Sequence, residues 1–132
     1  MKIVVADDEP DMRDYFVKIL SHLGHEVVAV AGDGKALVES CRRNVPDMVI
    51  TDLMMPELSG EDALRQIWLE QPVPAILISA YQCPEWIVKA EAIPPVRYLN
   101  KPINRAKLQS TLQSFEETTT ERSSCEDKAD NS

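Results

Sequence analysis

The amino-acid sequence predicts an α/β fold with a five-stranded parallel sheet and five helices on its two faces. Short apolar runs alternate with helix-like segments along the chain, which is typical of repeated βαβ units. The runs are apolar almost throughout, as strands are when both faces of their sheet are buried. Right-handed crossovers then place helices on both faces. A length of 132 residues suits one compact domain.

Four of the five apolar runs end in a residue suited to metal or phosphoryl chemistry. The first run leads into Asp7 and Asp8. The third leads into Asp52, the fourth into Ser79 and the fifth into Lys101. The second ends in a loop without such a group. The predicted strands are Ile3–Ala6, Val27–Val30, Met48–Thr51, Ala75–Ile78 and Val96–Asn100.

Helix signals fill the first three connections. Pro10 is favoured in a first turn, and Gly24 ends the helix that it begins. Asp33 can cap a second helix, which ends before Pro46. Ser59 opens a capping-box-like sequence at the start of a third. The apolar faces of these helices are formed by Met12, Phe16, Ile19, Leu23, Leu37, Cys41, Ala63, Leu64, Ile67 and Trp68.

Two further helices are expected. Pro84 begins the fourth, which ends before Pro94, and Asn104 caps the fifth. The inward residues of the fifth helix are Leu108, Leu112 and Phe115. Residues 118–132 contain almost no apolar side chain, so we expect a mobile polar tail or the start of a linker after a domain of residues 1–117.

Composition argues against several classes of partner. The formal net charge of −8 argues against direct binding of nucleic acid, whose phosphates attract Lys and Arg. No apolar run approaches the length of a membrane span. The first three residues enter the first predicted strand at once, so we expect no signal peptide and a cytoplasmic protein. The three cysteines form no CxxC pair and are typical of reduced cytosolic thiols.

The residues at the strand ends predict a site for a divalent cation and a phosphoryl group. The carboxyl ends of parallel strands meet at one sheet edge, where ligands of α/β sheets bind. The adjacent acids Asp7 and Asp8 repel each other, and a cation would relieve that repulsion. Each residue alone has an ordinary explanation, such as a turn aspartate or a solvated lysine. Their joint placement indicates oxygen ligands, a nucleophile and a positive charge at one point.

These residues stand in motifs that resemble the receiver domain of response regulators in two-component signalling. The resemblance runs from Met1 to about Phe115. It implies a CheY-like, flavodoxin-like doubly wound sheet with the strand order 2-1-3-4-5. The matching stretches are Val4–Pro10, Asp47–Pro56 followed by Gly60, Ile78–Tyr81 and Tyr98–Pro102.

The resemblance implies a role for each acid. Asp52 would be the phosphoacceptor, and its carboxylate would attack a phosphoryl group carried by a histidine of a partner kinase. Asp8 and Asp52 would bind Mg²⁺ directly, together with the backbone carbonyl of Met54. Asp7 would act mostly through a water bound to the metal.

Further residues receive roles in the same way. Lys101 would balance charge on the phosphoryl oxygens, and Ser79 would hydrogen-bond one of them. Tyr98 would be the aromatic switch that turns inward when Ser79 moves toward the phosphate. Pro102 resembles the family's cis-proline, which would aim Lys101 into the site.

One departure from the family pattern concerns the signalling face, and two further side chains concern hydrolysis of the phosphorylated state. Pro94 and Pro95 replace a turn that commonly contains glycine, on the face where the family usually signals. The side chains of Met54 and Tyr81 would lie beside the path of the hydrolytic water, and neither is an acid or an amide. We therefore expect a comparatively long-lived phosphorylated state.

The resemblance also implies partners. A sensor histidine kinase or phosphotransfer protein would donate the phosphoryl group. A downstream effector would bind the face of the fourth helix, fifth strand and fifth helix, and the domain would be a monomer or a phosphorylation-dependent dimer. Such a switch is not an enzyme beyond its own phosphoryl transfer and dephosphorylation.

Two other functions remain open from the residues. An Mg²⁺-dependent aspartyl-phosphate phosphatase of the haloacid-dehalogenase type requires a second Asp two residues after the nucleophile. This chain has Met54 at that position, which argues against such an enzyme. A flavodoxin-like or nucleotide-binding protein would more often show a glycine-rich loop after the first strand. Here the glycines, Gly32 and Gly34, follow the second run and are typical of a turn.

Overall fold

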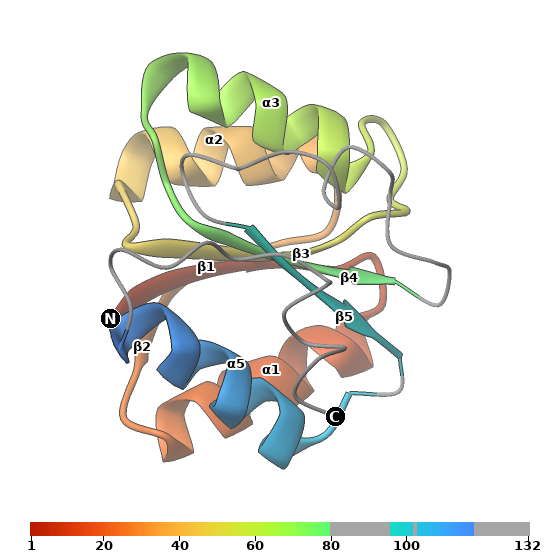
Figure 1. The fold of residues 1–132 in the computed structure, drawn as a ribbon. Coiled ribbons are helices and arrows are strands. Elements are labelled where there is room, and N and C mark those ends of the chain that lie inside the picture. The colour runs from red at the N-terminus through yellow and green to blue at the C-terminus, as the bar shows by residue number, and fades with distance from the viewer. Residues whose placement is uncertain (80–95, 102, 118–132) are drawn as a thin grey trace.

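Five parallel strands form one sheet in the order β2-β1-β3-β4-β5 (Figure 1). The computed structural model describes residues 1–79, 96–101 and 103–117, with side chains to Gln113. The order and direction of the strands confirm the predicted doubly wound, flavodoxin-like sheet. The strands are β1 (Lys2–Ala6), β2 (Glu26–Ala31), β3 (Met48–Asp52), β4 (Ala75–Ser79) and β5 (Val96–Asn100).

Four of the five expected helices lie in the part of the chain that the structure describes. They are α1 (Pro10–His22), α2 (Gly34–Asn44), α3 (Gly60–Glu70) and α5 (Arg105–Glu117). The predicted helix that begins at Pro84, the Pro94–Pro95 departure and the predicted polar tail fall outside the described residues. No described helix combines the length and the apolar composition needed to cross a membrane.

The predicted helix starts are confirmed at the level of single side chains. Pro10 is the first residue of α1. The side chains of Asp33, Ser59 and Asn104 each accept a hydrogen bond from the backbone N–H three residues later, at 2.8, 3.1 and 2.8 Å. Each bond satisfies an N–H that the helix itself leaves unpaired, which fixes where α2, α3 and α5 begin.

Alternation along the buried strands divides the core into two apolar layers. Val4 of β1 faces α2 and α3, whereas its neighbours Ile3 and Val5 face α1 and α5. Figure 1 shows α2 and α3 on one face of the sheet and α1 and α5 on the other. Since side chains point to opposite faces at each step along a strand, a continuous apolar run fills both layers.

The loop after α2 carries a strained residue. Val45 adopts a φ of 42° and donates its N–H to the Cys41 carbonyl at 3.0 Å, which closes the end of the helix. A β-branched side chain is unfavourable in this left-handed conformation, whereas glycine adopts it freely. Val45 is 64% exposed, so its side chain buries little apolar surface in return.

We predict that Val45→Gly raises the free energy of unfolding by about 1 kcal/mol, because it removes the left-handed strain. Urea unfolding of the purified domain measures the change. Val45→Ala is the matched control, since it keeps a Cβ atom and therefore most of the strain. A glycine variant no more stable than the alanine variant would contradict the prediction.

Candidate functional site

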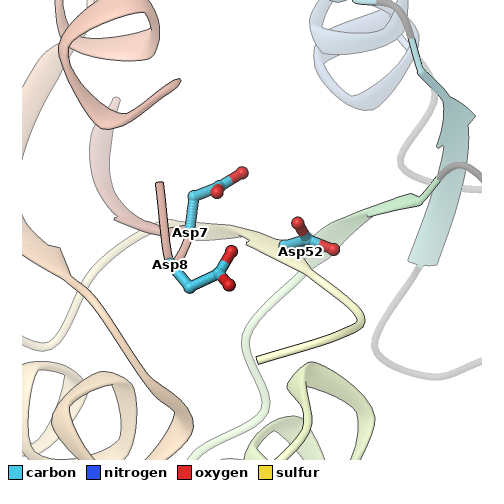
Figure 2. Close-up of side chains that lie close together, drawn as sticks. All are labelled: Asp7, Asp8 and Asp52. Atoms are coloured by element: carbon cyan, nitrogen blue, oxygen red, sulfur yellow. The ribbon is translucent and has the colours of Figure 1, made fainter. Parts of the chain in front are cut away.

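Three carboxylates from two neighbouring strands meet at the carboxyl edge of the sheet. Asp7 and Asp8 follow β1, and Asp52 is the last residue of β3. One oxygen of each lies within 4.8 Å of the others, and Figure 2 shows the three side chains directed toward a common space. Asp7 and Asp52 are buried, whereas Asp8 is exposed. The cluster is therefore set into the edge and open on one side.

Asp7 is a buried acid with one oxygen unused. Its Oδ1 atom accepts a hydrogen bond from the backbone N–H of Glu9 at 2.9 Å. Its Oδ2 atom is buried without a hydrogen-bond partner among the described residues, and the ammonium of Lys101 lies 3.9 Å away. Burial, opposed by the Glu9 hydrogen bond and reinforced by the charge of Asp52, raises the pKa of Asp7 from 3.8 to about 6. The acid is thus held where its charge is poorly compensated.

Asp52 lies between a cation and a backbone donor. The ammonium of Lys101 donates to Oδ2 at 2.9 Å, and the N–H of Met54 donates to Oδ1 at 3.1 Å. Burial by itself would lower the pKa of Lys101, but the hydrogen bond and charge of Asp52, with the charge of Asp7, raise it above the ordinary value. The lysine therefore stays charged beside the carboxylate.

The loop after Asp52 is shaped by close packing of Gly60. A Cβ atom at residue 60 would lie 2.0 Å from the carbonyl oxygen of Asp52, so a larger residue would displace this backbone. The Gly60 N–H also donates to the Leu53 carbonyl at 2.8 Å. The start of α3 thereby fixes the main chain that carries Asp52.

Ser79 and Tyr98 form a buried pair at the next two strands. Ser79 ends β4, Tyr98 lies in β5, and their side chains are hydrogen-bonded. Burial raises the pKa of Tyr98 more than its hydrogen bond with Ser79 lowers it. The Ser79 carbonyl accepts the N–H of Lys101 at 2.9 Å, which connects this pair to the cation of the site.

The structure brings the predicted site residues to one edge, with two falling outside its described part. Tyr81 and Pro102 are the residues not described. Met54 lies beside Asp52 with its side chain 61% exposed. Sequence reasoning missed Arg13, whose guanidinium donates to the Asp7 carbonyl at 2.7 Å. The charge of Arg13 near the N-terminus of α1 opposes the helix dipole, and this unusual placement is the sequence feature by which the residue could be found.

The donor set fits a hard divalent cation. The cluster offers carboxylate oxygens, which Mg²⁺ and Ca²⁺ prefer. The unpaired, buried Oδ2 atom of Asp7 is the sharpest observation, because a buried polar atom normally has a partner. The single charge of Lys101 does not neutralise the three carboxylates, and a bound cation would compensate the remaining negative charge.

We predict that Asp7→Asn stabilises the metal-free domain above pH 6. Because the pKa of Asp7 is raised in the folded state, the protonated acid stabilises the fold, and that contribution is lost as the pH rises through about 6. Asparagine never ionises, so the variant should exceed the parent by about 1–3 kcal/mol at pH 8, with the gap closing toward pH 4.

Urea unfolding in EDTA across this pH range measures the difference. Asp14→Asn, at an exposed position of α1, is the matched control and should follow the parent. A gap that stays constant from pH 4 to pH 8 would contradict the assignment of the raised pKa to Asp7.

Comparison with known proteins places these features in one family. The family model described as response regulator receiver domain matches residues 3–113. The transcriptional regulatory protein PdtaR of Mycobacterium tuberculosis is 31% identical over 112 residues, covering 85% of this chain and 55% of that protein. An uncharacterized response regulatory protein of Vibrio cholerae is 32% identical over 117 residues, covering 86% and 44%. The chain thus spans about half the length of these curated relatives.

Solved structures agree with this assignment. The receiver domain of the response regulator NarL from Mycobacterium tuberculosis has a TM-score of 0.74 at 28% identity, covering 89% of this chain and 97% of that one. CheY from Borrelia burgdorferi, solved in a complex with CheX, has a TM-score of 0.79 at 24% identity, covering 89% and 90%, and supports the fold alone. With the family model matched over most of its length, the chain belongs to the receiver domains of response regulators.

Proposed function

We propose that this receiver is switched by phosphorylation of Asp52, with Lys101 and a bound Mg²⁺ as its charge partners. The observation that carries the proposal is the Asp52 carboxylate itself. It ends a buried strand, contacts the Lys101 ammonium at 2.9 Å and shares an acid cluster with Asp7 and Asp8. A nucleophile with adjacent positive charge and a place for a metal is what phosphoryl transfer requires.

The transfer step follows from this arrangement. A carboxylate oxygen of Asp52 attacks the phosphorus of a phosphohistidine, a new P–O bond forms, and the P–N bond to the imidazole breaks. The imidazole leaves with the bonding electron pair and takes up a proton, and Asp52 becomes an acyl phosphate. Lys101, now beside Oδ2, can follow the negative charge onto the phosphoryl oxygens, while the Met54 N–H holds Oδ1.

We assign Asp8 and Asp52 as direct ligands of Mg²⁺, with the Met54 carbonyl, and Asp7 as a ligand through water. When bound, Mg²⁺ would neutralise charge on the phosphoryl group. The Glu9 N–H occupies Oδ1 of Asp7, which leaves Oδ2 to accept a hydrogen bond from a water bound to the metal. Pro102, which lies outside the described residues, remains the predicted cis-proline behind Lys101.

The hydrogen-bonded pair of Ser79 and Tyr98 suggests how the signal leaves the site. A phosphoryl group on Asp52 would compete with Tyr98 for the Ser79 hydroxyl. Loss or gain of that hydrogen bond would change the relative populations of two orientations of the Tyr98 side chain, as a conformational switch requires. Tyr98 belongs to β5, so its movement would reach the face of β5 and α5, where we propose that an effector binds.

The proposed domain ends with α5 near residue 117, and residues 118–132 form a tail or linker. A sensor histidine kinase or phosphotransfer protein is the proposed donor, and the oligomeric state and a cytoplasmic location stay predictions. The phosphatase alternative has no support from the comparisons. Receiver domains are in general switches rather than enzymes, and we propose the same here.

We predict that acetyl phosphate and Mg²⁺ add a single phosphoryl group to the domain, and that Asp52→Asn abolishes the addition. The amide is a poor nucleophile and cannot form the acyl phosphate. Intact mass spectrometry measures the added mass. Asp47→Asn is the matched control, because Asp47 precedes the other end of β3 and receives the Lys2 N–H. Equal phosphate uptake by Asp52→Asn would refute the assignment.

We predict that Met54→Asn speeds loss of the phosphoryl group about tenfold, because an amide beside Asp52 can orient the hydrolytic water. Decay of the phosphorylated domain after removal of acetyl phosphate measures the rate. Leu69→Asn, an exposed apolar position on α3, is the control for the added amide. Tyr81→Ala tests the second predicted rate-tuning residue. Decay rates equal to those of the parent would show that neither side chain controls hydrolysis.

A further inference from the structure

We propose that Arg13 is a positioning residue for the metal site, acting through the peptide that joins Asp7 to Asp8. The inference rests on the proposed function, because it takes the acid cluster to bind Mg²⁺. Arg13 belongs to α1, and its guanidinium is directed at the backbone of the loop after β1. Its Nη1 atom donates to the Asp7 carbonyl oxygen at 2.7 Å.

That hydrogen bond fixes the direction in which the chain enters Asp8. The Asp7 carbonyl and the Asp8 nitrogen belong to one planar peptide unit, which turns as a single body. A short hydrogen bond from a charged donor holds the unit at one angle. The other side of Asp7 is held independently, because its N–H donates to the Ala31 carbonyl at 3.1 Å. Asp8 is exposed, so its placement depends on this peptide.

Gly32 leaves the space that the guanidinium occupies. A Cβ atom at residue 32 would lie 3.1 Å from Arg13 Nη1, closer than ordinary van der Waals contact. Arg13 therefore sits between the loop after β1 and the loop after β2. A side chain at residue 32 would press on the guanidinium and shift it against the Asp7 carbonyl.

The position of this charge has a cost that the proposed role explains. A cation near the N-terminus of a helix meets the positive end of the dipole, which is unfavourable for α1. A cation near three acids also reduces their attraction for a metal. Placing the guanidinium on a peptide oxygen keeps it from pairing with a carboxylate, so the loop gains order while the acids remain ligands. Groups that orient metal ligands commonly affect affinity tenfold or more.

Calorimetric titration of Arg13→Ala and Arg13→Lys with Mg²⁺ and with Ca²⁺ tests the proposal. We expect both variants to bind Mg²⁺ about tenfold more weakly. Ca²⁺ tolerates irregular ligand geometry, so its affinity should fall less than threefold. Arg13→Lys keeps the charge without the planar donor and should resemble the alanine variant. An effect of charge alone has the opposite sign, because removing a cation would strengthen Mg²⁺ binding.

Arg42→Ala is the matched control, since Arg42 pairs with Glu70 between α2 and α3 and should leave Mg²⁺ affinity unchanged. Gly32→Ala perturbs the hydrogen bond between Arg13 and the Asp7 carbonyl without changing Arg13 itself. It should weaken Mg²⁺ binding in the parent and have no further effect in Arg13→Ala, because the contact is already lost. Urea unfolding in EDTA checks that each variant is folded.

Unchanged or tighter Mg²⁺ binding in Arg13→Ala would overturn the inference. Equal losses of Mg²⁺ and Ca²⁺ affinity, or additive effects of Gly32→Ala and Arg13→Ala, would overturn it as well. Failure of the parent domain to bind Mg²⁺ would instead overturn the proposed function, and this inference with it. Normal binding by the parent and by both Arg13 variants would remove only the role of Arg13.

Discussion

An excess of negative charge at one edge of a buried sheet is the constraint on which the functional part of this domain depends. Three carboxylates lie within 4.8 Å of one another, and Lys101 approaches two of them, at 2.9 and 3.9 Å. Burial adds to the cost, because the sheet removes Asp7 and Asp52 from water that would screen them. The buried apolar layers on both faces of the sheet offset this cost, and a cation bound at the cluster would relieve the repulsion.

Main-chain contacts hold this arrangement in place. Asp7 is fixed through its N–H, its carbonyl and one carboxylate oxygen. Asp52 is held by the N–H of Met54 and by the close packing of Gly60 on its carbonyl. Lys101 is placed by its own N–H, which donates to the last residue of β4. Because the strands are buried on both faces, these loops start from rigid ends, and small groups suffice to order them.

The sequence predicts the strands, their order of appearance and the gathering of acids well, for a physical reason. Continuous apolar runs and capping residues such as Asp33 and Ser59 are local signals, and the ends of parallel strands must meet at one edge. The strand order itself is predicted by the family resemblance and not by local signals. The contact between Arg13 and the Asp7 carbonyl is not predicted from the sequence, because the charge of Arg13 near the start of α1 shows an unusual placement but does not name its backbone partner. The left-handed conformation of Val45 was equally invisible, since valine disfavours it.

The two separate apolar layers have a consequence for how the domain can change over time. Phe16 and Leu20 pack on one face of the sheet, and Leu37 and Leu64 pack on the other, with the sheet as a partition between them. Among the described residues, the strands are what the two layers share, so repacking in one layer is passed to the other through them. One layer can therefore accept substitutions that suit a new binding partner while the other layer keeps its packing. Related domains can in this way evolve different binding partners without a change in the acid cluster.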